Sequence, residues 1–194
     1  MTPKRFTKIN EVVAKRQKYL TLVLENIHDP HNVSAILRSA DAVGIDKVYL
    51  IYNSNKFPRI GRISSASAKK WIELIRFKEV KECFDALKKE KFKIYSTYID
   101  NKKKSYSLYD LDLTDRVALV FGNEHTGVSE EVKSFSEKNF TIPMYGMVQS
   151  LNVSVAVAVC LYEALRQRES KNMYERSKFS KKELNEKLKK YSHK

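Results

Sequence analysis

The sequence predicts an α/β protein in which helices cover both faces of a parallel sheet. Between residues 21 and 168, short runs rich in β-branched and aromatic residues alternate with longer stretches that carry apolar residues every three or four positions. Such alternation is typical of strands joined by helical crossovers, and therefore of parallel pairing. Polar clusters also follow three of these runs, where open α/β sheets bind their ligands. Together these features favour a sheet with a functional site at one edge.

The expected strands are short and β-rich: Thr21–Glu25, Lys47–Tyr52, Ile72–Phe77, Phe92–Tyr98, Arg116–Phe121 and Phe140–Ile142. The expected helices between them have apolar residues on one face: Val33–Val43, Val80–Lys89, Val128–Ser136 and Val153–Arg168. Two further helices are expected near the ends of the chain, over Thr7–Tyr19 and Ser180–Tyr191. The second begins with a capping box formed by Ser180 and Glu183.

Charge divides the chain into three parts. Of its 194 residues, 37 are Lys or Arg and 23 are Asp or Glu, which gives a net charge of +14. The first 20 residues carry six Lys/Arg and one Glu, and residues 168–194 carry ten Lys/Arg and four Glu. We therefore expect an α/β domain over 21–168 with basic helical extensions over 1–20 and 169–194. Basic ends beside a nearly neutral body indicate a polyanionic partner such as nucleic acid.

Several protein classes are excluded by composition. No stretch approaches the roughly 18 uninterrupted apolar residues of a membrane helix, and the first residues lack the apolar run of a signal peptide, so we expect a soluble cytoplasmic protein. Cys83 and Cys160 have no partners at metal-ligand spacing and are expected to be buried thiols, with no metal site. The five glycines form neither a dinucleotide-binding loop nor a complete P-loop.

The three polar clusters are the candidates for the site. The first, over 26–38, follows the first strand; we expect Asn32 to cap the next helix, with Arg38 about a turn and a half inside it and facing an anionic partner. A surface ion pair of Arg38 with Asp41 or Asp29 is the alternative. The second cluster, over 121–127, places Glu124 just past the most apolar strand. The third, over 142–154, leads into a long apolar helix.

The clusters resemble, in order and spacing, the three motifs of the SpoU/TrmH branch of the SPOUT RNA 2′-O-ribose methyltransferases. The matching segments are Asn32-x-x-Ala35-x-x-Arg38, Phe121-Gly-Asn-Glu124-x-x-Gly127, Ile142-Pro-Met and Ser150-Leu-Asn-Val-Ser-Val-Ala156. The resemblance is to members that act on tRNA and extends along the whole chain. It implies a deep trefoil knot near the C-terminal end of the sheet, S-adenosylmethionine as cofactor, a homodimer, and a guanosine of the tRNA D-loop, at position 18, as the target.

The resemblance also implies roles for single residues. Arg38 matches the catalytic arginine, and Asn32 matches the asparagine that helps orient it. Three further positions match active-site polar residues: Glu124, Ser150 and Asn152. The expected cofactor pocket involves Thr97, Gly122, Ile142, Met144 and Leu151. The expected tRNA contacts come from the basic N-terminal helix, with Lys15 and Arg16, and from Arg166 and Arg168.

The chemistry leaves alternatives open. The 2′-hydroxyl must lose a proton, which the family proposal assigns to Arg38 with help from a substrate phosphate. Since a guanidinium is nearly always protonated, Arg38 could instead clamp that phosphate and stabilise the developing alkoxide. His28, His31 and His125 lie near the motifs and are expected to be bystanders. Methylation of ribosomal RNA is an alternative function, although such relatives commonly carry an RNA-binding domain ahead of the knot domain. A non-catalytic RNA-binding protein is another.

Overall fold

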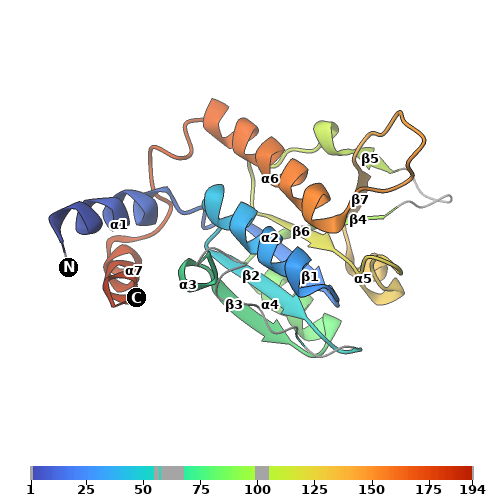
Figure 1. The fold of residues 1–194 in the computed structure, drawn as a ribbon, viewed down its shortest axis with the longest axis horizontal. Helices are drawn as coiled ribbons and strands as arrows, with labels where there is room; N and C mark the ends of the chain where they lie inside the picture. Colours follow the sequence, from blue (N-terminus) through green and yellow to red (C-terminus); the bar gives the residue numbers. More distant parts are fainter. Residues whose placement is uncertain (1, 55–56, 58–67, 99–104, 194) are drawn as a thin grey trace.

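Seven parallel strands form a single sheet in the order β3-β2-β1-β6-β4-β7-β5 (Figure 1). The computed structural model describes residues 2–54, 57, 68–98 and 105–193. The strands in chain order are β1 Leu20–Glu25, β2 Lys47–Ile51, β3 Glu73–Phe77, β4 Lys93–Thr97, β5 Tyr106–Ser107, β6 Val117–Phe121 and β7 Lys138–Thr141. Every pairing is parallel, for example Leu22 with Val48 and with Leu119. The expected α/β fold with a parallel sheet is confirmed.

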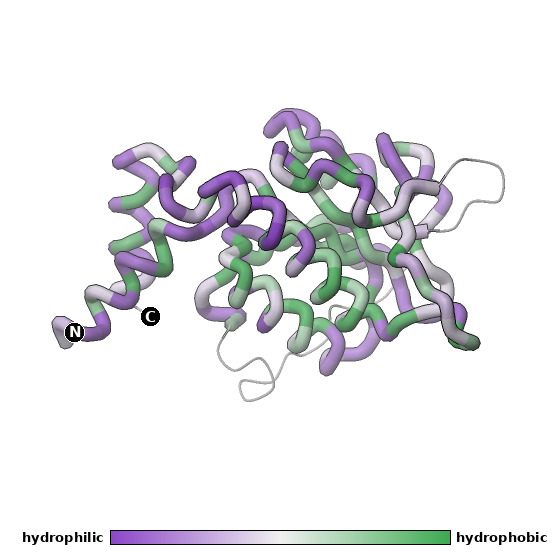
Figure 2. The backbone as a smooth tube through the Cα atoms, turned by 90° about the horizontal axis from the view of Figure 1, so that it is seen from above, coloured by the Kyte–Doolittle hydropathy of each residue, from purple (hydrophilic) through white to green (hydrophobic). Residues whose placement is uncertain are grey.

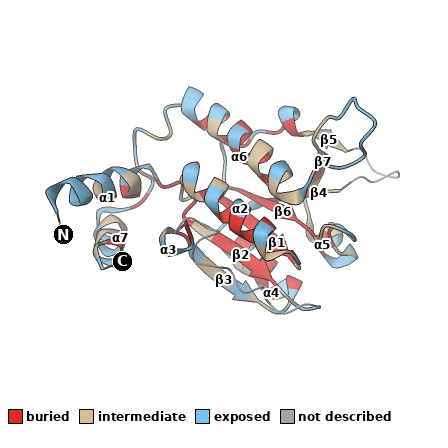
Figure 3. Ribbon diagram, in the orientation of Figure 1, coloured by how far each residue is buried: buried red, intermediate tan, exposed pale blue. Residues whose placement is uncertain are grey.

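Helices pack on both faces of the sheet because its strands are apolar on both sides. In β1, Leu20, Leu22 and Leu24 point to the face covered by α2 (Pro30–Ala42) and α6 (Val153–Ser170). Val23 points to the opposite face, which is covered by α4 (Val80–Lys89) and α5 (Glu130–Phe135). A central strand buried on both sides reads as a continuous apolar run. Figure 3 shows the resulting core in red along β1, β2 and β6.

Two expected helix starts differ in the structure. Helix α2 begins at Pro30, and its cap is Asp29, whose side chain accepts from the backbone N–H of His31; Asn32 lies inside the helix. Proline is well suited to the first helical position, since it has no N–H to satisfy there. The N-terminal helix α1 spans Pro3–Lys15 rather than 7–19, because Thr2 caps it and the chain turns at Arg16.

Short elements were not predicted from the sequence. Three elements are too short to show a helical or strand periodicity in the sequence: strand β5, the four-residue helix α3 (Ala68–Trp71) and the 3-10 turn η1 (Leu108–Asp110). Both cysteines are buried, as expected, and burial raises the pKa of the Cys83 thiol to about 12. No helix among the described residues is long and apolar enough to cross a membrane.

The two ends of the chain pack together beside the sheet. Helix α1 lies against α7 (Lys181–Ser192), which begins with the expected capping box, and Ile9, Val13 and Tyr191 form a small apolar cluster between them. Figure 2 shows these two helices near the marked termini, with mostly hydrophilic residues. Lys187 joins this pair to the sheet domain through an ion pair with the buried Asp46 at 2.6 Å.

Candidate active site

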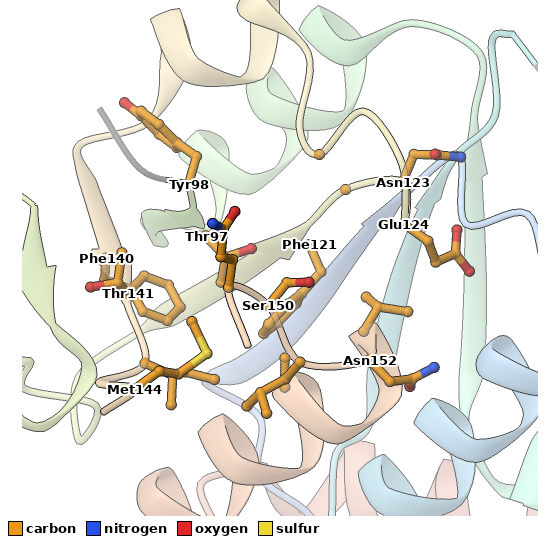
Figure 4. Close-up of a pocket in the computed structure, with 17 residues that line it drawn as sticks. Thr97, Tyr98, Phe121, Asn123, Glu124, Phe140, Thr141, Met144, Ser150 and Asn152 are labelled. Carbon is orange, nitrogen blue, oxygen red and sulfur yellow. The ribbon is translucent and has the colours of Figure 1, made fainter. Parts of the chain in front are cut away.

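A cavity of about 390 Å³ lies at the carboxyl ends of β4, β6 and β7 (Figure 4). This is the edge at which open parallel sheets bind ligands, and the volume falls within the roughly 300–1,000 Å³ of typical ligand sites. Its walls come from the end of β4, the turn after β6, the segment after β7 and the start of α6. The lining residues are Thr97, Tyr98, Phe121, Gly122, Asn123, Glu124, Gly127, Phe140, Thr141, Ile142, Met144, Gln149, Ser150, Leu151, Asn152, Val153 and Ala156.

Most of the expected site residues meet in this cavity. Glu124, Ser150 and Asn152 line it, although helix α5, strand β7 and a long loop lie between Glu124 and Asn152 in the chain. The expected cofactor residues line it as well: Thr97, Gly122, Ile142, Met144 and Leu151. Asn32 and Arg38 are not among the lining residues.

Asn32 joins the rim of the cavity through a chain of side-chain hydrogen bonds. Its amide donates to Oε1 of Glu124 at 2.8 Å, and its carbonyl oxygen accepts from the amide of Asn152 at 3.0 Å. Asn152 in turn caps α6, accepting from the backbone N–H of Ser154 at 2.8 Å. One hydrogen-bonded chain therefore links the first turn of α2, the turn after β6 and the start of α6, and fixes the orientation of all three side chains.

Glu124 is held as a carboxylate. Burial alone would raise its pKa, but the hydrogen bonds from the Asn32 amide and from the backbone N–H groups of His28 and Asp29 outweigh burial, so the pKa of Glu124 lies below its ordinary value. The two backbone donors immediately precede helix α2, where the helix dipole also favours negative charge. Glu124 is therefore ionised at neutral pH and serves as an acceptor rather than as a proton donor.

In the turn from Gly122 to Gly127, the backbone at the start of the turn packs directly against the backbone at its end. The backbone N–H of Asn123 donates to the carbonyl of Gly127 at 3.0 Å, and the reverse bond is 2.9 Å. A Cβ at Gly122 would lie 2.2 Å from the carbonyl group of Gly127 and 2.3 Å from the nitrogen of Val128. Only glycine fits at this position, which explains the Phe121-Gly122-Asn123 sequence at the end of the strand.

The cavity is suited to a ligand that is partly apolar and partly polar. Phe121, Phe140 and Leu151 supply an apolar floor, while Thr97 and the Gly122 turn add polar groups. A nucleoside has this mixture of a flat ring and hydroxyl groups, so the lining fits the adenosine part of S-adenosylmethionine. Among the described residues no group of three or more His, Cys, Asp or Glu side chains could hold a metal ion.

Arg38 lies elsewhere on α2 from the position expected of it. Because the helix begins at Pro30, Arg38 is in its second half, so the unfavourable dipole at the helix N-terminus does not act on it. The suggested ion pair with Asp41 is also absent, since Asp41 pairs with Arg16. The Arg38 side chain is exposed and makes no hydrogen bond or ion pair with any residue that the structure describes.

Two of the four expected RNA contacts have a different role. Arg168 is 1% exposed, and its guanidinium donates to four acceptors: the carbonyls of Leu113, Tyr19 and Asp115 and the side chain of Gln17. Arg16 is equally buried, between the carbonyl of Ile45 and the carboxylate of Asp41.

The prediction that the side chains of Arg16 and Arg168 contact RNA is therefore wrong, and both side chains have a structural role instead. The sequence pattern showed a basic residue in each case but not which way it pointed. Lys15 and Arg166, by contrast, are exposed, and the Arg166 side chain is paired with Glu163 at 2.8 Å.

Several residues of the site were not singled out from the sequence. Tyr98, Asn123, Thr141 and Gln149 line the cavity beside residues that were. Asn123 also donates from its side chain to the carbonyl of Asn26 at 2.8 Å, joining the turn after β6 to the end of β1. Its position between Gly122 and Glu124 was the available signal, because a side chain just past a strand end faces the ligand edge.

Comparisons with known proteins agree with this geometry. Residues 19–162 match the model of the SpoU rRNA Methylase family. The chain belongs to this family. It is 39% identical over 98% of its length to a tRNA (guanosine(18)-2′-O)-methyltransferase of Aquifex aeolicus, covering 89% of that protein. It is 42% identical over 90% of its length to the protein of the same name from Thermus thermophilus, again covering 89%.

Solved structures of SpoU proteins have the same fold. The A. aeolicus TrmH/SpoU tRNA modifying enzyme superposes with a TM-score of 0.91 at 39% identity, covering 98% of this chain and 95% of that one. The SpoU methyltransferase AviRb from Streptomyces viridochromogenes, solved in complex with the cofactor AdoMet, gives a TM-score of 0.71 at 26% identity, covering 80% and 62%. The fold is therefore shared with other SpoU proteins.

Proposed function

We propose that this SpoU-family chain transfers the methyl group of S-adenosylmethionine to the ribose 2′-oxygen of a guanosine in tRNA, at position 18 of the D-loop. The observation that carries the proposal is the hydrogen-bonded chain Asn152–Asn32–Glu124 at the rim of a nucleoside-sized cavity. Its support is the similarity, over most of the chain, to proteins named for this reaction.

In this proposal the cofactor lies in the cavity at the ends of β4, β6 and β7. Thr97, Gly122, Ile142, Met144 and Leu151 would hold it, and the Gly122 turn would lie close to it because no side chain intervenes there. The cofactor supplies the methyl group and its own leaving group. The chain's contribution is then to position the acceptor oxygen in line with that methyl group, which accounts for a large part of the barrier reduction in such transfers.

Glu124, Asn32 and Asn152 act as positioning residues for the acceptor ribose in this scheme. Ser150 lines the cavity between them and the cofactor residues. The lowered pKa of Glu124 makes it a weak base, so it orients hydroxyl groups rather than removing the proton. Arg38 is assigned the remaining role, in which its permanent charge clamps a substrate phosphate and stabilises negative charge on the 2′-oxygen, while the hydroxyl proton passes to solvent water.

We further propose that the active unit is a homodimer. Its support is that Arg38 is exposed and does not line the cavity of its own chain, so in this proposal the Arg38 of a second chain completes the site. Helix α6, which packs against α2, also exposes Val155 and Tyr162, apolar side chains that a partner would cover. Similarity to SpoU structures supports a trefoil knot formed by the segment between β7 and α6.

The proposed domain arrangement follows the charge and the packing. Residues 21–168 form the methyltransferase domain, and the extensions over 1–20 and 169–194 bind tRNA in the cytoplasm. The support is the excess of Lys and Arg in both extensions and the contact between α1 and α7, which gathers that charge on one side of the molecule. Exposed Lys15 and Arg166 are the proposed contacts, since phosphate binding requires accessible cations.

Ribosomal RNA is the second candidate substrate. A 23S rRNA (guanosine-2′-O-)-methyltransferase of Escherichia coli is 34% identical over 81% of this chain, which covers 64% of that protein. The tRNA enzymes are more similar and match over more of both chains, which favours tRNA. A non-catalytic RNA-binding protein is disfavoured because such a protein would not need the Asn152–Asn32–Glu124 chain.

Methyl transfer to defined RNAs tests the proposal. Purified protein is incubated with labelled S-adenosylmethionine and with unmodified tRNA transcript or ribosomal RNA, and the product is digested and mapped by mass spectrometry. We expect 2′-O-methylguanosine in the tRNA D-loop. Label in ribosomal RNA alone would support the second candidate, and cofactor binding with no transfer to either RNA would contradict both.

A further inference from the structure

A second cavity, of about 590 Å³, lies beside the first at the carboxyl ends of β1 and β2. Asn123 and Gly127 line both cavities, so only the turn after β6 separates them. The second cavity is lined mainly by polar residues: Glu25, Asn26, His28, Asn53, Ser54, Asn123, His125, Thr126, Gly127, Val128 and Ser129. Neither the cofactor nor the proposed positioning residues use this space.

Glu25, in the wall of this cavity, is a buried carboxylate with an unused acceptor. It is 2% exposed, and its Oε2 accepts from the backbone N–H of Ser129 at 2.8 Å. Its Oε1 has no hydrogen-bond partner among the residues that the structure describes. A buried carboxylate oxygen without a partner is costly, so such a group calls for an explanation by a ligand or by bound water.

One residue of the wall, Asn26, has an unusual backbone conformation. Asn26, directly after Glu25, has φ of 51°, in the left-handed region that few residues other than glycine adopt. Its side chain donates to Asn53 at 2.7 Å and accepts from the backbone N–H of the same residue at 3.2 Å. This pair ties the ends of β1 and β2 together. His28 and His125 are exposed and line the same cavity, providing flat rings at its rim.

The second cavity adjoins the proposed methyl-transfer site. Glu124 lines the first cavity, and its carboxylate accepts from the backbone N–H of His28, which lines the second, at 3.2 Å. The two cavities are therefore close enough for a nucleotide whose ribose lies at Glu124 to reach the second cavity with its base. Enzymes that act on one nucleotide of a folded RNA commonly turn that base out of its stack into such a pocket.

We propose that the second cavity binds the guanine base of the target nucleotide and that Glu25 is a specificity-determining residue. The proposal rests on the function proposed above. Guanine presents two adjacent donors on its Watson–Crick edge, N1–H and the 2-amino group, which match a carboxylate. Adenine presents an acceptor at N1, which a carboxylate repels. Glu25 can keep its bond from Ser129 while accepting from the base, because each carboxylate oxygen has two lone pairs.

Base entry requires movement of side chains at the rim. Oε1 of Glu25 is closed to solvent, whereas Asn53 and His125 are exposed. Rotamer changes of this size are common when a surface binds its ligand. The histidine rings then give the base surfaces on which to stack, in addition to the edge read by Glu25.

A series of transcripts tests the base pocket in the wild-type protein. Three tRNA transcripts differ only at the target position, which carries guanosine, inosine or adenosine; inosine lacks the 2-amino group and keeps N1–H. We expect kcat/KM for methyl transfer to fall about tenfold or more from guanosine to inosine, and further for adenosine. Equal rates for guanosine and inosine would overturn the proposal. No transfer to any transcript would instead contradict the proposed function.

The variant Glu25→Gln tests whether Glu25 is responsible for the discrimination between guanosine and inosine. The amide keeps an acceptor for Ser129 but offers a donor to the base, so the guanosine-to-inosine ratio should fall toward one while S-adenosylmethionine binding is unchanged. Glu130→Gln, at an exposed position of α5 outside the cavity, is the matched control and should keep the wild-type ratio.

An unchanged ratio in folded Glu25→Gln protein would mean that Glu25 binds only water there, and would overturn its assigned role. If this variant does not fold, Asn53→Ala, at an exposed position of the same wall, replaces it. Loss of the wall that Asn53 supports should also reduce the guanosine-to-inosine ratio. A guanosine-to-inosine ratio in folded Asn53→Ala that equals the wild-type ratio would overturn the base pocket.

Discussion

The side-chain amide of Asn32 donates to Oε1 of Glu124 at 2.8 Å, between residues 92 positions apart in the chain. This bond connects the first turn of α2 to the turn after β6, and the amide of Asn152 extends it to α6. Three segments that the sequence presents separately thereby become one rigid rim around a nucleoside-sized cavity. The proposed reaction depends on that rim holding the acceptor ribose in place.

Replacing Glu124, the acceptor at the end of the Asn152–Asn32–Glu124 chain, should reduce catalysis more than cofactor binding. In Glu124→Gln the amide group faces the Asn32 amide and loses part of the backbone hydrogen bonding. We expect methyl transfer to fall by about 100-fold, with the Kd for S-adenosylmethionine changed by less than about threefold. Single-turnover transfer and equilibrium binding measure the two. Glu131→Gln, exposed on α5, is the control and should resemble wild type.

The lowered pKa of Glu124 predicts how stability depends on pH. Its folded pKa lies below its unfolded value, so the carboxylate contributes stability that is fully present above the unfolded pKa and is lost as pH falls through the folded pKa. Urea unfolding of wild type and Glu124→Gln at pH 7 and at about pH 3.5 measures this contribution. We expect the stability difference between the two proteins to narrow at the lower pH. A difference that grows on acidification would contradict the assignment.

Arg38 should matter for chemistry and not for folding. Its side chain is exposed and unpaired among the described residues, so Arg38→Ala should change the free energy of unfolding by less than about 0.5 kcal/mol. Cofactor binding should be retained and transfer lost. Arg38→Lys keeps the charge but not the planar fork, and we expect it to restore little activity. Full activity in Arg38→Ala would remove this residue from the mechanism.

Substitutions of Arg168 and of Arg166 should have different effects, because Arg168 has a structural role and Arg166 is a proposed RNA contact. Arg168→Ala leaves four buried acceptors without their donor, so unfolding free energy should fall by at least about 3 kcal/mol. Arg166→Ala removes an exposed cation and should leave the unfolding free energy nearly unchanged. It should instead weaken tRNA binding and reduce the salt dependence of that binding. Thermal unfolding and binding at two salt concentrations distinguish the two effects.

The close backbone approach at Gly122 predicts that an alanine substitution there destabilises the protein more than one at Gly146. A Cβ at Gly122 meets backbone atoms at 2.2 Å, whereas one at Gly146 meets nothing within 4 Å. Gly122→Ala should therefore destabilise the protein by about 1–3 kcal/mol and impair cofactor binding. Gly146→Ala should have little effect on stability. Equal effects of the two substitutions would show that the turn relaxes without loss.

The fold could be predicted from the sequence because its signals are local and repeated. The run at 117–121 is apolar throughout, which is typical of a strand buried on both faces, and Val80–Lys89 matched its helix to the residue. The helix starts were less well predicted. Asp29 and Asn32 are both good caps by residue type, and the choice between them depends on Pro30, which favours the first helical position.

The cavity could be predicted in part, since its residues follow strand ends and match family motifs. The pairing of Asn32 with Glu124 and Asn152 could not be predicted by spacing, because it depends on how α2 and α6 pack. The burial of Arg16 and Arg168 was missed for a similar reason. Both look like members of basic segments, and only the three-dimensional structure shows the carbonyl groups that surround them.

Transfer to a transcript that lacks a single oxygen tests the central claim most directly. Two tRNA transcripts are prepared that are identical except at guanosine 18, where one carries the ribose 2′-hydroxyl and the other carries deoxyribose. We predict that the protein with labelled S-adenosylmethionine methylates the first, giving 2′-O-methylguanosine, and leaves the second unlabelled. Equal labelling of the deoxyribose transcript would contradict the account, because the methyl group would then be transferred to some other atom.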